Sequence, residues 1–332
     1  MKLIVYHDDR YPTHWISREM SDSIKTHFVA GGFKACNANE LAAWMEESVA
    51  KDECWQSLVL FSQDVVPQTI CHLPFPSSLI RSYLDSGGTV VWVGDIPFYY
   101  VGLDSSSAQG KEHKIGDKDL TRQTTFKDDA GKTAITYGRT ACFAMLGTIP
   151  VWLNYPIFKV KITEAGYQFG VKTHWYSNRP ILIRGSNFRK KKPIALAVSS
   201  PRYLMSEEKS ILSEEKERKL PLNFMDFVFK FLGVVPALIA GATVLVSIMA
   251  GFGAAVTLSL LATSCFLLTG YIAYWFFWAR RTLASAWFIN FDRRHPTSGF
   301  LRLWDYIPNK ITDNMLEELD RLCRARIDRP PS

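Results

Sequence analysis

Short apolar runs alternate with amphipathic stretches through the first hundred residues. Four runs have the length of buried strands: KLIVYH (2–7), FKAC (33–36), SLVLFS (57–62) and TVVWVG (89–94). Helical patterns separate them at 15–29, 38–50 and 77–88. The first and third of these helices end at glycine pairs, which are common helix stops. This regular alternation predicts an α/β domain with a doubly wound parallel sheet.

The domain is expected to extend to residue 200 and to resume near the carboxyl end of the chain. PIALAVSS (193–200) has the pattern of a last central strand. Residues 283–328 carry many aromatic and aliphatic side chains, and a segment this short does not easily form a core of its own. We therefore expect 283–328 to pack back on residues 1–200.

An uncharged stretch interrupts the two parts, because residues 231–278 contain no Asp, Glu, Lys, Arg or His. One helical crossing of a bilayer needs about 20 apolar residues. The stretch therefore predicts a transmembrane hairpin with spans near 231–250 and 255–278, preceded by a charged amphipathic connector at 201–230. The alternative is a buried helical hairpin in a soluble protein, which the lack of a polar stripe disfavours.

The flanks of this hairpin predict its orientation and partners. Basic residues lie on both flanks and none lies in the turn, so both termini are expected to be cytoplasmic, with the lipid bilayer as a partner. The small residues Ala237 and Gly241 favour a homo-oligomer formed through the hairpin. The net charge is +7, but basic and aromatic residues are not interleaved, so nucleic acid is not an expected partner. Six cysteines without a CxxC pair fit a reduced compartment.

Polar side chains stand just past three of the predicted strands. The first strand ends in His7-Asp8-Asp9, the third is followed by Gln63-Asp64, and the fourth is followed by Asp95. The carboxyl ends of parallel strands share one edge of the sheet, where ligands bind, so a small-molecule ligand is expected there. Two residues near a later strand pattern are added to these. The candidate ligand-binding residues are Asp8, Asp9, Gln63, Asp64, Asp95, His174 and Arg179.

Other roles for the same residues stay open. Asp8, Asp64 and Asp95 could hold Mg²⁺, which prefers oxygen ligands. Alternatively the acids cap helices and turns, where Asp is favoured, and His174 simply packs beside a strand. The polar stretch 102–132 reads as a long loop or lid over the same edge.

Two quoted segments carry a resemblance to a known family. SLVLFSQDVVP, followed by SSLIRSYLDSGGTVVWVGDIPF, resembles the class I glutamine amidotransferase-like superfamily in its trehalose-utilisation and galactosidase-trimerisation branches. The likeness covers residues 1–100 and, loosely, 140–200. It implies a flavodoxin-like fold, and the W-x-x-N-F…P-x-S-G-F-x-R-x-W-D run resembles a closing segment of such proteins.

The chain departs from that family at the nucleophile. Working members carry a cysteine in a G-x-C-x-G elbow, whereas Gly94 is followed here by Asp95, Ile96 and Pro97. Without a thiol and a paired base, thioester chemistry has no starting point. The resemblance therefore implies the scaffold without glutaminase activity.

Together these patterns predict a membrane-anchored cytosolic domain that binds or senses a ligand without catalysis. The hairpin would be its anchor or its output, as in a signalling or defence effector. The alternative is a metal-dependent hydrolase that uses Asp8, Asp64 and Asp95 on a sugar or nucleotide. The sequence identifies neither the ligand nor a cofactor.

Overall fold

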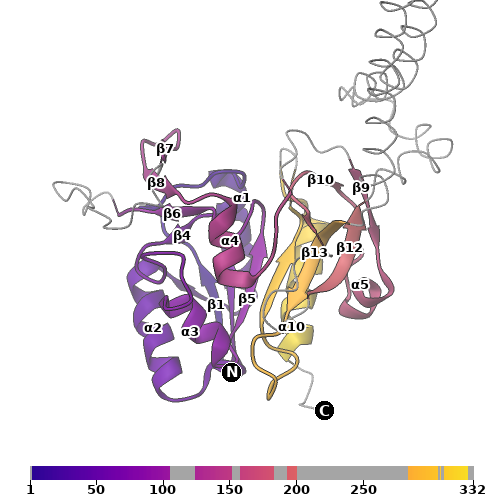
Figure 1. Ribbon diagram of the computed structural model, residues 1–332, viewed down its shortest axis with the longest axis horizontal. Helices are drawn as coiled ribbons and strands as arrows, with labels where there is room; N and C mark the ends of the chain where they lie inside the picture. The colour runs from indigo at the N-terminus through magenta and orange to yellow at the C-terminus, as the bar shows by residue number, and fades with distance from the viewer. Residues whose placement is uncertain are drawn as a thin grey trace, which may run out of the picture. The chain divides into compact units, whose positions relative to one another are not determined.

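A mixed ten-stranded sheet organises the computed structural model (Figure 1). The structure describes residues 2–104, 124–151, 158–182, 193–199, 283–305, 307 and 310–327. They belong to one unit, Met1–Ser199 with Thr282–Ser332. The strand order is β10-β9-β12-β13-β14-β5-β3-β1-β2, and β11 pairs with β13 off this path.

One half of the large sheet is parallel. Its strands are β1 (Lys2–Tyr6), β2 (Lys34–Cys36), β3 (Ser57–Phe61), β5 (Thr89–Val93) and β14 (Phe300–Leu303). In register, Val5 lies beside Leu60, and Leu60 lies beside Val91. The neighbour of β5 on its other side is β14, which comes from the carboxy-terminal part of the chain and also runs parallel to it.

The other half of the large sheet is antiparallel. Its strands are β9 (Phe158–Ile162), β10 (Tyr176–Ser177), β11 (Ile181–Leu182), β12 (Ile194–Ser199) and β13 (Leu283–Ile289). Strand β12 runs antiparallel to both β9 and β13, and β13 runs antiparallel to β14. The prediction of a doubly wound, flavodoxin-like parallel sheet is therefore wrong. A short run buried on both faces predicts a strand but contains no information on the direction of its neighbours.

Helices cover both faces of the sheet, which explains the continuous apolar runs. They are α1 (Arg18–Ala30), α2 (Ala38–Ala50), α3 (Leu79–Asp85), α4 (Arg139–Leu146), α5 (Glu164–Phe169) and α10 (Asp313–Ile327), with a short 3-10 helix η1 (Cys54–Gln56). Along β5, Trp92 packs in a core shared with α2, α3 and α4, whereas Val91 and Val93 pack in a core shared with α1 and α10. Alternate residues of one strand thus enter two separate cores.

A second, four-stranded sheet has the order β4-β6-β8-β7. Its strands are β4 (Val66–Pro67), β6 (Tyr100–Gly102), β7 (Thr124–Lys127) and β8 (Thr133–Thr136). Figure 1 shows it beyond the carboxyl ends of β1 and β5. The expected lid at 102–132 therefore contributes β7 and the turn into β8, while 105–123 lies outside the described residues.

The structure does not support the predicted two-span membrane protein with cytoplasmic termini. In the described ranges no helix is long and apolar enough to cross a membrane. Among them α10, with 15 residues, is longer than α1 or α2 with 13 each, and it is rich in charge. A crossing needs about 20 apolar residues. The predicted hairpin (231–278), its connector (201–230) and the oligomer contact fall outside the described residues.

Candidate metal centre

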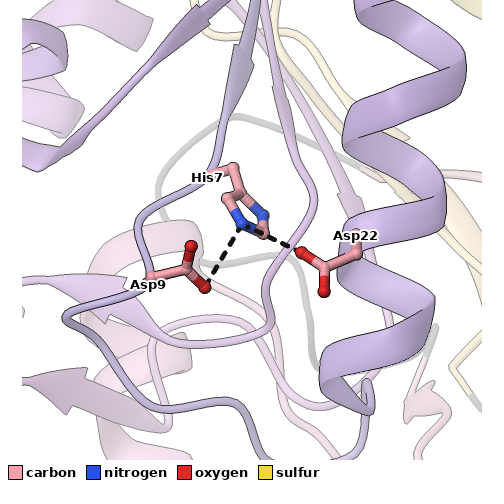
Figure 2. A group of neighbouring side chains, drawn as sticks. All are labelled: His7, Asp9 and Asp22. Atoms are coloured by element: carbon pink, nitrogen blue, oxygen red, sulfur yellow. Dashed lines mark ion pairs between the residues drawn. The ribbon is translucent and has the colours of Figure 1, made fainter.

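His7 lies directly after β1, at the edge where the parallel strands end. Helix α1 passes beside this edge and brings Asp22 to the same place (Figure 2). The helix begins where the Ser17 hydroxyl accepts a hydrogen bond from the backbone N–H of Met20, a common N-terminal cap. The apolar residues Met20, Ile24 and Phe28 pack toward the sheet, so that Ser21 beside them is buried against the strands and Asp22 is exposed to solvent.

Three potential metal-ligand atoms converge here. His7 Nε2 lies 3.2 Å from Asp22 Oδ1 and 3.6 Å from Asp9 Oδ1 (Figure 2). All three atoms lie within 4.8 Å of one another. Donor atoms around a tetrahedral ion bonded at about 2.1 Å are separated by about 3.4 Å. The two His7 distances are close to that separation.

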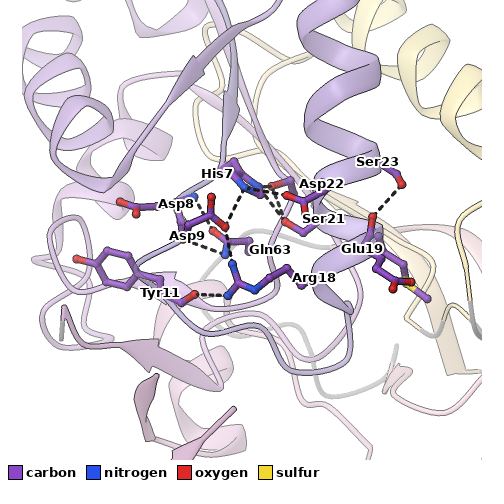
Figure 3. Close-up of polar contacts among 12 residues, drawn as sticks. His7, Asp8, Asp9, Tyr11, Arg18, Glu19, Ser21, Asp22, Ser23 and Gln63 are labelled. Carbon is purple, nitrogen blue, oxygen red and sulfur yellow. Dashed lines mark hydrogen bonds and ion pairs between the residues drawn. The ribbon is translucent and has the colours of Figure 1, made fainter. Parts of the chain in front are cut away.

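The other ring nitrogen of His7 is held from behind. His7 Nδ1 lies 3.0 Å from Ser21 Oγ (Figure 3). It also lies 3.1 Å from Ser62 Oγ, and the two hydroxyls are 3.1 Å apart. The Ser62 hydroxyl donates its proton to the carbonyl oxygen of Tyr6, at 2.8 Å. It is therefore left as an acceptor toward His7 and Ser21. Such contacts fix the orientation of an imidazole and hold its other nitrogen in place.

His7 Nε2 is buried and makes no hydrogen bond in the part of the chain that the structure describes. The side chain of His7 is 2% exposed, whereas those of Asp9 and Asp22 are 67% and 53% exposed. Burial lowers the pKa of His7, Lys25 adds to this effect, and the two carboxylates oppose it. A neutral imidazole is the form that binds metal ions. The Ser62 oxygen, left as an acceptor, favours the tautomer with the proton on Nδ1, and in that tautomer the lone pair of Nε2 faces two carboxylates.

Two basic side chains already contact Asp9. Arg18 Nη1 donates to Asp9 Oδ1 at 2.5 Å, and Lys132 Nζ donates to the Asp9 carbonyl oxygen (Figure 3 draws the arginine contact). Arg18 therefore partly neutralises the Asp9 carboxylate.

The neighbouring Asp8 has a different environment. It is buried, accepts hydrogen bonds from Arg10 Nη2 at 2.7 Å and from the backbone N–H of Ala38 at 3.0 Å, and so fixes the start of α2. Burial opposes its ionisation, but these hydrogen bonds outweigh burial and lower its pKa. Gln63 holds the Asp8 backbone, accepting from its N–H at 2.9 Å and donating to its carbonyl at 3.2 Å.

Asp64, at the end of β3, accepts its described hydrogen bonds from the backbone of a single segment, residues 14–16. Its carboxylate accepts hydrogen bonds from the N–H groups of His14, Trp15 and Ile16 at 2.9, 2.6 and 3.2 Å. The residue is 1% exposed. Burial raises the pKa of Asp64, and the N–H donors act in the opposite direction. Its contacts anchor the segment that leads into α1.

Asp95, at the end of β5, is fully buried beside two basic groups. Its Oδ2 lies 3.3 Å from His14 Nδ1, and its Oδ1 lies 3.5 Å from Arg179 Nε. The guanidinium of Arg179 stacks over the ring of Trp15, 4.8 Å from its centre. The preceding residue, Gly94, has φ +92°, and a Cβ there would lie 2.8 Å from Ile16. Only glycine lets the 14–16 segment approach this closely.

The predicted site residues thus divide into separate groups. Asp8 and Gln63 contact each other, and Asp95 and Arg179 face each other. Asp64 binds backbone amides, and His174 is exposed, with no contact to these groups in the described ranges. Among the predicted residues, only Asp9 lies in the cluster of potential metal ligands.

Comparison with known proteins gives the family of the chain. A family model described as the MJECL34 family matches residues 1–211, which is more than half of the sequence. The chain belongs to the MJECL34 family. A similar protein, "Uncharacterized protein MJECL34" of Methanocaldococcus jannaschii, is 36% identical over 101 residues. That match covers 30% of this chain and 34% of the relative, so it spans about a third of the relative's length. No solved structure matches the chain.

Membership of the MJECL34 family corrects the predicted resemblance to amidotransferase-like proteins. The matches give no amidotransferase-like family, neither for the trehalose-utilisation type nor for the galactosidase-trimerisation type. The quoted segments consist of a buried strand, a helix ending in Gly87-Gly88 and a second buried strand. This pattern recurs wherever a helix joins two parallel strands, so it indicates an α/β unit and no particular family.

Sequence reasoning missed two of the three potential ligands in this MJECL34-family chain, His7 and Asp22, together with the supporting Ser21. His7 stands at a strand end, but the prediction names only the acids and the glutamine at these ends. Asp22 and Ser21 lie inside a helix, and the sequence does not show which helix face meets the end of β1. One signal was present: Met20, Ile24 and Phe28 recur at every fourth residue and mark the buried face of this helix.

Proposed function

We propose that this domain binds a divalent transition-metal ion through His7, Asp9 and Asp22. One observation supports the proposal above the others. His7 Nε2 is buried without a hydrogen bond, and it lies 3.2 and 3.6 Å from carboxylate oxygens of Asp22 and Asp9. A buried polar atom without a partner is rare in native proteins and calls for an explanation such as a bound ion.

The donor set favours particular ions. One imidazole nitrogen and two carboxylate oxygens suit Zn²⁺, Co²⁺ or Mn²⁺, whereas Mg²⁺ and Ca²⁺ prefer oxygen ligands alone. We expect Zn²⁺ to bind more tightly than Mn²⁺, following the general order of affinity for divalent ions. Two ionised carboxylates and a neutral imidazole also balance the charge of a divalent ion.

The proposal retains ligand binding and places it at the end of β1. The alternative hydrolase would need Asp8, Asp64 and Asp95 to act together on a metal. Asp8 and Asp64 already accept hydrogen bonds from backbone N–H groups, which supports structural roles for them. Three protein ligands would leave positions open on the ion for water or a further ligand.

Isothermal titration calorimetry of the full chain with ZnCl₂, MnCl₂ and MgCl₂ tests the proposal. We expect one Zn²⁺ site per chain, weaker Mn²⁺ binding and no Mg²⁺ binding at the same concentrations. Asp22→Asn should weaken Zn²⁺ binding at least tenfold, because it removes one ligand charge from an exposed position. His7→Gln should do the same, but this position is buried, so Asp22→Asn is the decisive variant.

Glu19→Gln is the matched control. Glu19 is exposed on the same helix as Asp22 and carries the same charge, but it lies outside the cluster. The control should bind Zn²⁺ like the unmodified chain. Absence of Zn²⁺ binding, or equal binding by the Asp22 and Glu19 variants, would contradict the proposed function.

A further inference from the structure

Arg18 donates a hydrogen bond to one of the oxygen atoms proposed as metal ligands. Its Nη1 donates to Asp9 Oδ1 at 2.5 Å, and this is the oxygen that also lies 3.6 Å from His7 Nε2. The Arg18 side chain is 30% exposed, so it is partly buried but has room to change its orientation. A metal ion that binds Asp9 Oδ1 must therefore share this oxygen with the guanidinium or displace it.

Two other acceptors lie within reach of the same guanidinium. Arg18 Nη2 donates to the carbonyl oxygen of Tyr11 at 3.2 Å (Figure 3), and it lies 3.6 Å from Asp128 Oδ2. The Asp128 side chain is 9% exposed and faces Arg18 with its second carboxylate oxygen. A small rotation of the guanidinium would shorten this ion pair to hydrogen-bond distance.

Asp128 is fixed in place by its own turn. Its Oδ1 accepts hydrogen bonds from the backbone N–H groups of Ala130 and Lys132, at 3.0 and 2.8 Å, within the turn between β7 and β8. Lys132 also donates to the carbonyl oxygen of Asp9. The β7–β8 turn is thus connected to the end of β1 through two basic side chains, and its acceptor is already oriented.

We propose that Arg18 is a resident cation on Asp9, and that metal binding transfers it to Asp128 and so couples the metal centre to the β7–β8 turn. The proposal rests on the proposed metal-binding function. Like charges repel at short range, and a divalent ion attracts the carboxylate more strongly than one guanidinium does. The released guanidinium gains a direct partner in Asp128, which tightens a turn whose hydrogen bonds depend on that same carboxylate.

Metal titrations of charge-matched variants test the first half of the proposal. Arg18→Gln should bind Zn²⁺ about three to ten times more tightly than the unmodified chain, because the competing cation is gone. Lys25→Gln is the control: Lys25 acts on His7 electrostatically but does not contact Asp9 in the described ranges. Its removal should change affinity less. Equal gains in the two variants would show a general charge effect and overturn the proposal.

A double-mutant cycle tests the transfer to Asp128. Asp128→Asn should weaken Zn²⁺ binding about threefold, because Arg18 loses its second partner, and Asp129→Asn in the same turn should change it less. In the Arg18→Gln background, Asp128→Asn should have no effect on affinity. An unchanged effect of Asp128→Asn in that background would contradict the transfer.

Hydrogen exchange gives an independent readout of the turn. Zn²⁺ should slow exchange of the amides of Ala130 and Lys132 in the unmodified chain and should not slow it in Arg18→Gln. Slowing of equal size in both would overturn the coupling. The two proposals fail separately: loss of all Zn²⁺ binding removes the metal centre, whereas Zn²⁺ binding that depends on Asp22 but not on Arg18 removes only the coupling.

Discussion

The ends of β1 and β3 carry acids of the same chemical type in opposite situations. At the end of β3, the Asp64 carboxylate accepts three backbone N–H donors and is 1% exposed. At the end of β1, Asp9 and Asp22 are exposed, while His7 Nε2 between them is buried and makes no hydrogen bond in the described structure. The first carboxylate is satisfied by the fold itself, whereas in the second group Arg18 pairs with Asp9 and His7 Nε2 has no hydrogen bond among the described residues.

The difference arises from the course of one segment. Residues 14–16 cross over the end of β3 and present their N–H groups to Asp64 before α1 begins. The helix then passes the end of β1 with side chains rather than N–H groups facing it. An acid at a strand end therefore indicates a binding site only when nearby backbone N–H groups do not already donate hydrogen bonds to its carboxylate.

The largest expected effect is on stability at the β3 end. Asp64→Asn should lower the free energy of unfolding by about 3 kcal/mol, because an amide cannot accept all three buried N–H donors as the carboxylate does. Asp22→Asn, which changes an exposed side chain near the end of β1, should change the free energy of unfolding by less than about 0.5 kcal/mol. Urea denaturation of both variants measures this, and equal losses would erase the distinction between the two ends.

Metal binding near the end of β1 should stabilise the folded chain against unfolding. Zn²⁺ at about one hundred times its dissociation constant should add about 2.7 kcal/mol to the stability of the full chain, because it binds the folded state. Thermal unfolding should then shift upward by several degrees. The Asp22→Asn variant should show little of this shift, whereas Glu19→Gln should retain it. A shift of the same size in Asp22→Asn would locate the ion elsewhere.

The next largest effect is expected from the serine hydroxyls that contact His7 Nδ1, through their influence on Zn²⁺ affinity. Ser21→Ala removes a hydroxyl 3.0 Å from His7 Nδ1, so the imidazole is held less firmly and Zn²⁺ binding should weaken about tenfold. Ser23→Ala is the control on the same helix, because its exposed hydroxyl donates only to the Glu19 carbonyl among the described contacts. Calorimetric titration should separate the two variants, and equal affinities would argue that the serines do not position His7.

Removal of a third carboxylate, that of Asp292, should have the smallest effect on stability. Asp292 is buried, which opposes ionisation, but hydrogen bonds from Arg294 and His295 lower its pKa to about 2. Its stabilising contribution is therefore complete above the ordinary pKa near 3.8. That contribution is lost as pH falls through about 2, and it amounts to about 1 kcal/mol after screening by solvent. Urea titrations from pH 5 to pH 2 should show a shallower loss for Asp292→Asn than for the unmodified chain.

Much of the local structure was predictable from the sequence, but the pairing of its strands was not. The apolar runs at 2–7, 57–62 and 89–94 contain β1, β3 and β5, and the pattern at 38–50 coincides with α2. Burial on both faces produces such runs in parallel and antiparallel surroundings alike. The antiparallel placement of β12 and the second sheet depend on contacts between residues distant in sequence.

The sequence predicts a candidate site at the same edge of the sheet as the proposed metal centre, but with mostly different residues. Strand-end position identified Asp9, because that position depends only on the local pattern. It could not distinguish Asp64, whose N–H donors come from residues 14–16, about fifty positions earlier. Nor could it identify Asp22, which reaches His7 only through the placement of α1.

Anomalous X-ray diffraction from crystals of the full chain grown with Zn²⁺ tests the central claim most directly. The account predicts an anomalous peak within bonding distance of His7 Nε2 and of carboxylate oxygens of Asp9 and Asp22, with Nδ1 still beside Ser21 and Ser62. A peak located on other residues, or an imidazole whose Nε2 donates a hydrogen bond to a carboxylate with no metal present, would contradict it.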